Sequence, residues 1–567
     1  MVTLRPIQEK ILSEIRENAD KKVIVINAPT GVGKSIVNLI TASDIFGSGY
    51  VTSPLRVLVS QYSNDIRGKF QGEFSAWSVM GRDSYPCKYL NDRGFDKVTA
   101  DGAPCTIDGY EFVKNSLEDS DQQQEYGDRR KTPTSTECPV RKKAECGYFN
   151  DKDISMSSNI SVHTFHYFYL GVFRSFDNSE QKQGWPPRSC LVIDEAHDMV
   201  STLCDFFKVS VSSTTGIKRG DNEYDFPFHE LRDNLSKMIE KGASMNEKLE
   251  YFTSLISKYV ADKTSELQVL LPLLNQKKKD TKEWKALMEH TLRLKRVINK
   301  MDTFHRYTTM ADEWALSIGD ENVELKPFSP KPFMGPLWSS FHHIVLSSAT
   351  MFQPERMLED IGLGNASRLI INAPSDFPPD KGPIQFYNPV RLNRDNFDST
   401  LPGILNSVKR IASSHPTEKG IIHAFSRKYQ EAIFNNSDPL LKKRFIIHDS
   451  KNREEKINEF IESKEPSIFL SVNFGKGVDL HDDLARWQVI VKAPIPSFGD
   501  PWIAYHRQKD ASFTDVQAIR EIMQMSGRIV RSREDYGVTY ILDGYARTLL
   551  KRYWNSLPEW FRERVVW

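Results

Sequence analysis

Nine residues near the amino terminus, 27–35, place two glycines, a lysine and a serine in the order Asn-Ala-Pro-Thr-Gly-Val-Gly-Lys-Ser. An apolar run at 23–26 precedes them and a helix-forming stretch at 36–40 follows, which is the setting of a phosphate-binding loop. The glycines let backbone N–H groups turn toward a phosphate, and the helix start adds the positive end of its dipole. The lysine can reach the β- and γ-phosphates, and the serine hydroxyl can bind Mg²⁺. The predicted nucleotide-binding residues are Ala28 (where the pattern has glycine), Pro29, Thr30, Gly31, Val32, Gly33, Lys34 and Ser35, with Lys34 also catalytic. The alternative is an ordinary turn that holds Gly-Lys-Ser.

Two adjacent carboxylates, Asp194 and Glu195, follow an apolar run at residues 190–193. Ligands of a parallel sheet gather where its strands end, so this pair is expected at the same sheet edge as the phosphate loop. Asp194 is suited to hold Mg²⁺, and Glu195 to orient and deprotonate the attacking water. Paired acids after a strand also occur by chance, but a phosphate loop on the same chain makes coincidence a poor explanation.

A third segment, residues 524–531, reads Gln-Met-Ser-Gly-Arg-Ile-Val-Arg. Gln524, Arg528 and Arg531 lie at spacings i, i+4 and i+7, which predicts one helix face carrying an amide and two guanidiniums. Guanidiniums make bidentate contacts with phosphate and stabilise charge on a transferring γ-phosphoryl group. Both arginines are assigned to the nucleotide cleft, the choice between them stays open, and the alternative is an exposed amphipathic helix. Gly527 would allow close approach to an opposing domain.

Four of the six cysteines fall within sixty residues, with gaps of 17, 32 and 7 residues between them. Zinc sites generally contain closely spaced cysteine pairs, and the wide gaps here favour an iron–sulfur cluster, with zinc or unligated thiols as alternatives. Residues 83–150 are polar, so we expect them to lack a core of their own and to need a metal centre; residues 115–136 should form a mobile loop. The predicted cluster ligands are Cys87, Cys105, Cys138 and Cys146, whereas Cys190 should be buried packing.

The chain of 567 residues has 76 Lys and Arg against 75 Asp and Glu, a net charge of +1. This net charge gives no indication of nucleic-acid binding, but a local basic groove would be sufficient for such binding. Neither a long apolar run nor a signal peptide is evident, which predicts a soluble, intracellular protein, cytoplasmic or nucleoid-associated, without membrane contact.

Strands and helices alternate at both ends of the chain, which predicts an α/β fold with parallel sheets. The long spacings between motifs indicate two insertions: the cysteine segment, and a stretch at 229–305 with apolar residues at helical spacing, which should pair as an antiparallel helical hairpin. Within it Pro272 should interrupt the helix, and the lysines at 277–279 should lie near a turn. Prolines at 374–383 predict a linker over residues 368–384. The expected domains are 1–82, 151–204 and 336–384 for the first α/β domain with its linker, 83–150 for the cysteine segment, 205–335 for the helical insertion, and 385–567 for the second α/β domain.

In their order along the chain, these motifs resemble superfamily 2 helicases of the Asp-Glu-Ala-His type, in the branch that contains XPD and DinG. The resemblance also covers residues 52–54, 161–167, 347–351 and 473–480. It implies two RecA-like motor domains with a [4Fe–4S] domain and an arch domain inserted into the first. It further implies that Gln8 reads adenine, that His197 couples the nucleotide site to the other motor half, and that Asp479 lies near the nucleotide ribose or in the coupling network. A solvated surface glutamine is the alternative for Gln8.

These observations predict an ATP-dependent DNA helicase that uses ATP, Mg²⁺ and a [4Fe–4S] cluster. Its expected partners are single-stranded and forked DNA, and a monomer is expected. DNA as substrate and 5′→3′ polarity come from the resemblance alone. Two alternatives stay open: a DNA-stimulated ATPase that remodels R-loops or strips proteins with little unwinding, and a non-catalytic ATP-gated nucleic-acid clamp.

Overall fold

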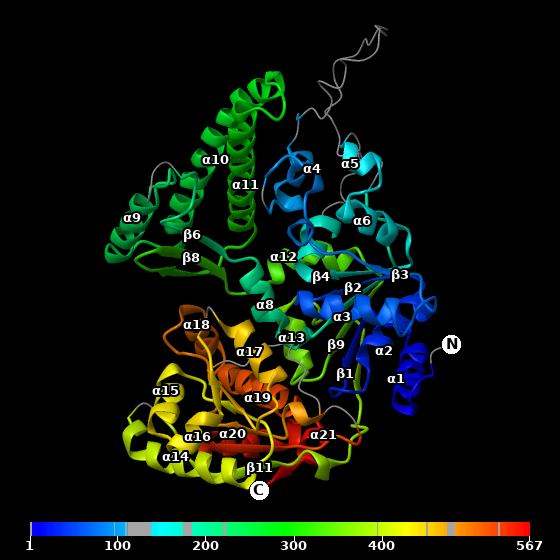
Figure 1. Ribbon diagram of the computed structural model, residues 1–567, viewed down its shortest axis with the longest axis vertical. Helices are drawn as coiled ribbons and strands as arrows, with labels where there is room; N and C mark the ends of the chain where they lie inside the picture. The colour runs from blue at the N-terminus through cyan, green and yellow to red at the C-terminus, as the bar shows by residue number, and fades with distance from the viewer. Residues whose placement is uncertain are drawn as a thin grey trace.

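The computed structural model describes residues 3–95, 97–107, 110, 138–173, 184–218, 223–393, 395–449, 452–472, 482–530 and 533–567. Two seven-stranded sheets, one in each half of the molecule, form its framework (Figure 1). A pair of long helices stands away from the first sheet, and the carboxyl terminus lies on the second half. The α/β class with two parallel sheets, predicted from the alternating pattern, is confirmed.

The first sheet has the order β10-β1-β9-β5-β2-β4-β3, and every pair of neighbours is parallel. Its central strands are short apolar runs buried on both faces, as helix-covered parallel sheets require. Both insertions leave the chain between strands that are neighbours in the sheet, since β3 pairs with β4 and β5 pairs with β9. The strands are β1 (Val23–Asn27), β2 (Gly49–Ser53), β3 (Ala76–Ser78), β4 (Ile160–Thr164), β5 (Cys190–Asp194), β9 (His343–Ser348) and β10 (Arg368–Asn372).

The second sheet has the order β13-β14-β12-β15-β16-β11-β17 and is also parallel throughout. Its strands are β11 (Ile384–Val390), β12 (Gly420–His423), β13 (Phe445–Ile447), β14 (Ile468–Ser471), β15 (Trp487–Ile490), β16 (Val538–Asp543) and β17 (Val565–Val566). The helices around it are α14 (Phe397–Ser414), α15 (Arg427–Asn436), α16 (Pro439–Arg444), α17 (Arg453–Glu462), α18 (Pro501–Lys509), α19 (Phe513–Ser526), α20 (Gly544–Arg552) and α21 (Glu559–Arg562).

The linker between the halves is shorter than the proline pattern predicts. Residues 368–372 form β10, the edge strand that pairs with β1 of the first sheet. Its apolar side chains pack on the first half, with Ile371 only 3 % exposed, so burial holds this segment in a sheet. The crossing between halves is therefore confined to residues 373–383.

The helical insertion forms the expected antiparallel hairpin, made by α10 (Met245–Gln276) and α11 (Lys282–Met310). The prediction that Pro272 interrupts the first helix is wrong, because Pro272 lies inside α10 and the helix runs on to Gln276. The lysines at 277–279 do lie at the turn. A three-stranded antiparallel sheet under the hairpin was not foreseen from the sequence; it contains β6 (Val209–Ser212), β7 (Trp314–Ile318) and β8 (Asn322–Pro327).

The cysteine segment has an apolar core after all, contrary to the expectation from its polar composition, because the helical hairpin supplies part of it. Trp284 of α11 is fully buried and lies edge-on against Phe95, with ring centroids 6.0 Å apart. Arg93 and Asp280 add an ion pair across the same contact at 3.3 Å. The segment and the tip of the hairpin thus share one core, whose members include Tyr89, Leu90, Ile107, Tyr110, Leu274, Met288 and Leu292.

Helix α18 of the second half packs against the small sheet beneath the hairpin. The Trp502 indole N–H donates to Pro327 O at 2.9 Å, and His506 Nε2 donates to Phe328 O at 2.8 Å. Tyr505 stacks on Phe328 with ring centroids 3.6 Å apart. Burial lowers the pKa of His506 to about 4, so this contact is uncharged at neutral pH. We refer to the contact of α18 with Pro327 and Phe328 as the α18 seat.

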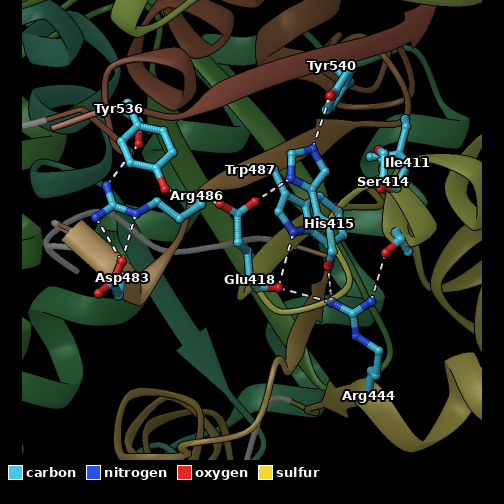
Figure 2. A network of polar contacts seen from close by, with 11 residues as sticks. Ile411, Ser414, His415, Glu418, Arg444, Asp483, Arg486, Trp487, Tyr536 and Tyr540 are labelled. Atoms are coloured by element: carbon cyan, nitrogen blue, oxygen red, sulfur yellow. Dashed lines mark hydrogen bonds and ion pairs between the residues drawn. The ribbon is translucent and has the colours of Figure 1, made fainter.

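A polar network lies at the amino-terminal ends of β12 and β15 in the second sheet and reaches Tyr540 of β16 (Figure 2). His415 lies 2.5 Å from Glu418, 3.1 Å from the Tyr540 hydroxyl, and stacks on Trp487. The Arg444 guanidinium donates to backbone carbonyls, those of Ala412, His415, Glu418 and Pro466. This network accounts for the order of that edge, and we assign it no chemistry.

Candidate nucleotide cleft

The phosphate loop connects β1 to α2 (Lys34–Ile40), as its sequence predicts. Gly31 and Gly33 adopt φ angles of 84° and 83°, which favour glycine and turn the backbone around the loop. The ammonium of Lys34 donates to Ala28 O at 3.1 Å and lies 3.4 Å from Pro29 O. These carbonyls hold the charge inside the loop, where it lines the cleft.

Gln8 is buried, at 5 % exposure, which rules out the solvated surface glutamine considered from the sequence. It lies on α1 (Pro6–Glu17) and its side-chain amide N–H donates to Val32 O at 2.9 Å. A Cβ atom at Gly33 would lie 2.4 Å from the same amide nitrogen, so the glycine also makes room for Gln8. Arg5 adds a hydrogen bond from Nη1 to Gly31 O at 2.6 Å. Helix α1 and its N-cap residue Arg5 thus hold the carbonyls of Gly31 and Val32 in the loop.

The acidic pair stands at the end of β5, directly beside the loop. Asp194 is buried, whereas Glu195 is partly exposed and adopts a φ of 54°, in the left-handed region that costs a non-glycine residue energy. Burial, together with the nearby charge of Glu195, raises the pKa of Asp194 to about 6. The backbone N–H of Glu195 donates to Asp194 Oδ1 at 3.0 Å and so fixes one carboxylate oxygen.

His197 connects three parts of the site. Its Nδ1 lies 2.8 Å from the Ser348 hydroxyl at the end of β9 and 3.3 Å from Glu195. Its Nε2 lies 3.4 Å from the side-chain amide nitrogen of Gln524 on α19 in the second half. The imidazole thus contacts Glu195 of the acidic pair, the neighbouring strand and Gln524 of the second half.

The segment after Gln524 is not one continuous helix, and the prediction of a single face with three side chains is wrong. Helix α19 ends at Ser526, and Gly527 caps it with its N–H bonded to Met523 O at 3.2 Å. Arg528 therefore follows the helix end, yet it is buried and lines the cleft with Gln524. Glycine commonly ends a helix. The i, i+4 spacing of Gln524 and Arg528 gives no indication that the helix ends between them.

Gly527 touches the phosphate loop across the two halves. The Thr30 hydroxyl donates to Gly527 O at 2.9 Å, and a Cβ at position 527 would lie 3.1 Å from the Thr30 hydroxyl oxygen. The halves meet here without a bulky side chain between them.

These elements enclose a cleft of about 720 Å³ between the two halves. Most of the predicted site residues line it: Gln8, Thr30, Gly31, Gly33, Lys34, Ser35, Asp194, Glu195, Gln524 and Arg528. Ala28, Pro29 and Val32 belong to the loop but are buried behind its surface. Asp479 and Arg531 lie outside the described residues.

The four clustered cysteines, Cys87, Cys105, Cys138 and Cys146, line one common cavity despite their wide spacing in sequence. Burial raises the pKa of the Cys87 thiol to about 11, and Arg82 donates from Nη1 to Cys105 Sγ at 3.3 Å. Among the described residues, no three His, Cys, Asp or Glu side chains converge closely enough to hold a metal ion as they stand. Four thiols on a single cavity with a neighbouring guanidinium donor are nevertheless the donor set that a cysteine-ligated cluster requires.

Other residues singled out by the family motifs are internal. Thr52 and Ser53 are fully buried in β2, and Phe165 and Tyr167 pack in the core of the first half, whereas His166 is exposed. Cys190 is buried in β5, as expected. None of the helices in the described ranges combines the length and apolar character needed to cross a membrane.

The two parallel sheets with a cleft between them form a fold that solved helicase structures of low sequence identity share. Residues 1–217 match the family described as type III restriction enzyme, res subunit, and residues 408–564 match the helicase C-terminal domain. A solved XPD helicase has a TM-score of 0.61 at 16 % identity, covering 97 % of this chain and 98 % of its own. The S. tokodaii Xpd4 structure has a TM-score of 0.54 at 14 % identity, covering 99 % and 100 %.

Two curated relatives are similar to parts of this chain. The ATP-dependent DNA helicase CHL1 of Vanderwaltozyma polyspora is 26 % identical over 258 residues, which cover 40 % of this chain and 29 % of that protein. The Fanconi anemia group J protein homolog of Gallus gallus is 25 % identical over 122 residues, covering 19 % and 10 %. The chain thus matches less than a third of the length of these relatives. Together with the motifs, these similarities support the resemblance of the chain to XPD/DinG-like helicases of superfamily 2.

Proposed function

We propose that this protein is an ATP-dependent DNA helicase that moves along single-stranded DNA from 5′ to 3′ and parts duplex or forked DNA. The observation that carries the proposal is the cleft whose walls come from both halves, with Lys34 and Glu195 on one side and Arg528 on the other. Such a cleft couples nucleotide state to the relative position of the halves.

The roles of the residues follow from their chemistry. Lys34 neutralises phosphate charge, Ser35 and Asp194 would hold Mg²⁺, and Glu195 orients and activates the attacking water. Bound Mg²⁺ supplies charge neutralisation at the phosphates. Arg528, and Arg531 where the resemblance holds, stabilise the transferring phosphoryl group, while Gln8 reads the adenine and Asp479 contacts the ribose. His197, in contact with both Glu195 and Gln524, relays nucleotide state to the second half.

Nucleic-acid contact is expected to be mainly with phosphates and stacked bases. Binding should therefore show little sequence preference and weaken steeply with salt. The domain limits belong to the same proposal, with residues 83–150 as the cluster domain and residues 205–335 as the arch. A monomer would suffice, because one chain supplies both walls of the cleft.

The test is the unwinding of forked DNA substrates with a 5′ or a 3′ single-stranded arm, followed together with ATP hydrolysis. We expect ATP-dependent unwinding of the fork with the 5′ arm. Hydrolysis stimulated by DNA without strand separation would replace the helicase by a remodelling ATPase. ATP binding without turnover would leave only a nucleotide-gated clamp.

We also propose that Cys87, Cys105, Cys138 and Cys146 hold a [4Fe–4S] cluster that braces the duplex-parting region. The cluster supplies a rigid cross-link among the four thiolates, and metal binding of this kind contributes directly to folding. The shared core with α11 would carry that rigidity to the hairpin tip.

Cys87→Ser is therefore expected to lose bound iron and unwinding while retaining part of the ATPase, because the nucleotide cleft lies in a different part of the fold. Iron and acid-labile sulfide, measured after anaerobic purification, provide the readout. Cys190→Ser is the matched control, since Cys190 is buried in β5 and does not line the cysteine cavity. Wild-type protein without iron, or with zinc instead, would contradict the cluster assignment.

A further inference from the structure

Tyr62 is a buried residue that touches the predicted Mg²⁺ site but belongs to no motif recognised in the sequence. It lies on α3 (Arg56–Arg67), which packs against the first sheet, and is 2 % exposed. Its hydroxyl donates to Asp194 Oδ2 at 3.0 Å. The same hydroxyl accepts a hydrogen bond from Asn38 Nδ2 on α2 at 2.9 Å.

The direction of this chain of hydrogen bonds is set by the groups at its ends. An ionised carboxylate can only accept, and an amide nitrogen can only donate. The Tyr62 hydrogen is therefore committed to Asp194, and the Tyr62 oxygen to Asn38. Since Glu195 N–H occupies Oδ1, each oxygen of the Asp194 carboxylate has its own donor, one from α3 and one from the next residue.

The hydroxyl also connects the two residues that would hold the metal. Ser35, at the start of α2, interacts with the Tyr62 hydroxyl as well. Asn38 is fully buried one turn further along the same helix. The phosphate-loop helix and the acidic strand are thus joined through one phenol, away from the open side of the cleft.

We propose that Tyr62 is a positioning residue for nucleotide-bound Mg²⁺: its hydroxyl, oriented by Asn38, fixes the carboxylate of Asp194 relative to Ser35. This inference rests on the proposed ATPase, because it assumes that Asp194 and Ser35 face the metal. Outer-shell partners of metal ligands contribute to metal affinity without touching the ion. Tyr62 therefore acts through Asp194 and takes no part in the chemistry itself.

The direct test is Tyr62→Phe, which keeps the ring and removes the hydroxyl. Binding of ADP is measured by calorimetry with Mg²⁺ and with EDTA, and the Mg²⁺ concentration that half-saturates the ATPase is measured in parallel. We expect the gain in ADP affinity due to Mg²⁺ to shrink, and the half-saturating Mg²⁺ concentration to rise, by about tenfold. ADP binding in EDTA should stay at the wild-type level.

The matched control is Tyr50→Phe, which removes another buried hydroxyl from the same half. That hydroxyl donates to Pro186 O at 2.6 Å and does not line the cleft. A second variant, Asn38→Leu, removes the donor that orients Tyr62 and should shift Mg²⁺ dependence in the same direction by a smaller factor. It keeps the proposal testable should Tyr62→Phe fold poorly.

Unchanged Mg²⁺ dependence in folded Tyr62→Phe or Asn38→Leu would overturn the proposal, as would equal losses of ADP binding with and without Mg²⁺. A wild-type protein that neither binds nor hydrolyses ATP would instead refute the proposed function. The two failures are therefore distinguishable.

Discussion

Replacing Arg528 by alanine is expected to lower the DNA-stimulated ATPase rate by about a thousandfold or more, with a much smaller effect on ATP binding. Arg528 belongs to the second half but lines the cleft opposite the phosphate loop. Its charge matters most when negative charge redistributes on the γ-phosphoryl group, so the loss should fall on kcat.

Arg528→Lys separates charge from shape, because lysine keeps the charge but cannot make the bidentate contact. We expect it to restore only part of the rate. Arg410→Ala on the exposed face of α14 is the control for loss of a positive charge from the same half and should behave as wild type. A folded Arg528→Ala variant with wild-type kcat would remove the second half from the chemistry and leave Arg531 as the remaining candidate.

Lys34→Ala is expected to reduce the DNA-stimulated ATPase by about two orders of magnitude or more, to background. The ammonium lies in the loop, 3.1 Å from Ala28 O, where it can pair with phosphate charge at little cost in movement. The carbonyls that Lys34 contacts, those of Ala28 and Pro29, belong to a loop at the cleft. We therefore expect the thermal unfolding temperature of Lys34→Ala to change little.

The measurement is ATP turnover with saturating single-stranded DNA, together with the thermal unfolding curve. Lys10→Ala, at an exposed position of α1, controls for removing a lysine from the same half. Undiminished turnover in a folded Lys34→Ala protein would overturn the assignment of the nucleotide site.

Local signals explain which parts could be predicted from the sequence. The phosphate loop combines a β-branched strand, two glycines with positive φ and a helix start within a few residues, so its geometry follows from neighbouring residues. The same holds for the apolar run before Asp194. Both parallel sheets could be predicted because their strands are short apolar runs separated by helical periodicity.

The features missed depend on contacts between distant segments. Tyr62 owes its place to the packing of α3 against β2, β3 and β4, and nothing in its sequence neighbours signals a partner 132 residues away. The core of the cysteine segment was not foreseen because part of it comes from α11. Helix spacing concealed the end of α19 at Ser526, although the glycine that follows was a signal for it.

Pro272 illustrates the opposite case, in which tertiary packing overrides a local signal. The proline removes one backbone donor from α10, but Leu274 beyond it is buried in the core shared with the cysteine segment. That burial offsets the lost hydrogen bond and carries the helix on to Gln276.

The α18 seat has a mechanical consequence. The hairpin is inserted into the first half, but Pro327 and Phe328 near its base contact Trp502 and Tyr505 of the second half. Helices of 32 and 29 residues form a rigid hairpin roughly 45 Å long, so a rotation of a few degrees at its base displaces its tip by several ångströms. When the two halves open or close, therefore, either the contacts of the α18 seat must slide or the hairpin must tilt. A small hinge motion then produces a larger displacement where the hairpin meets the cysteine segment.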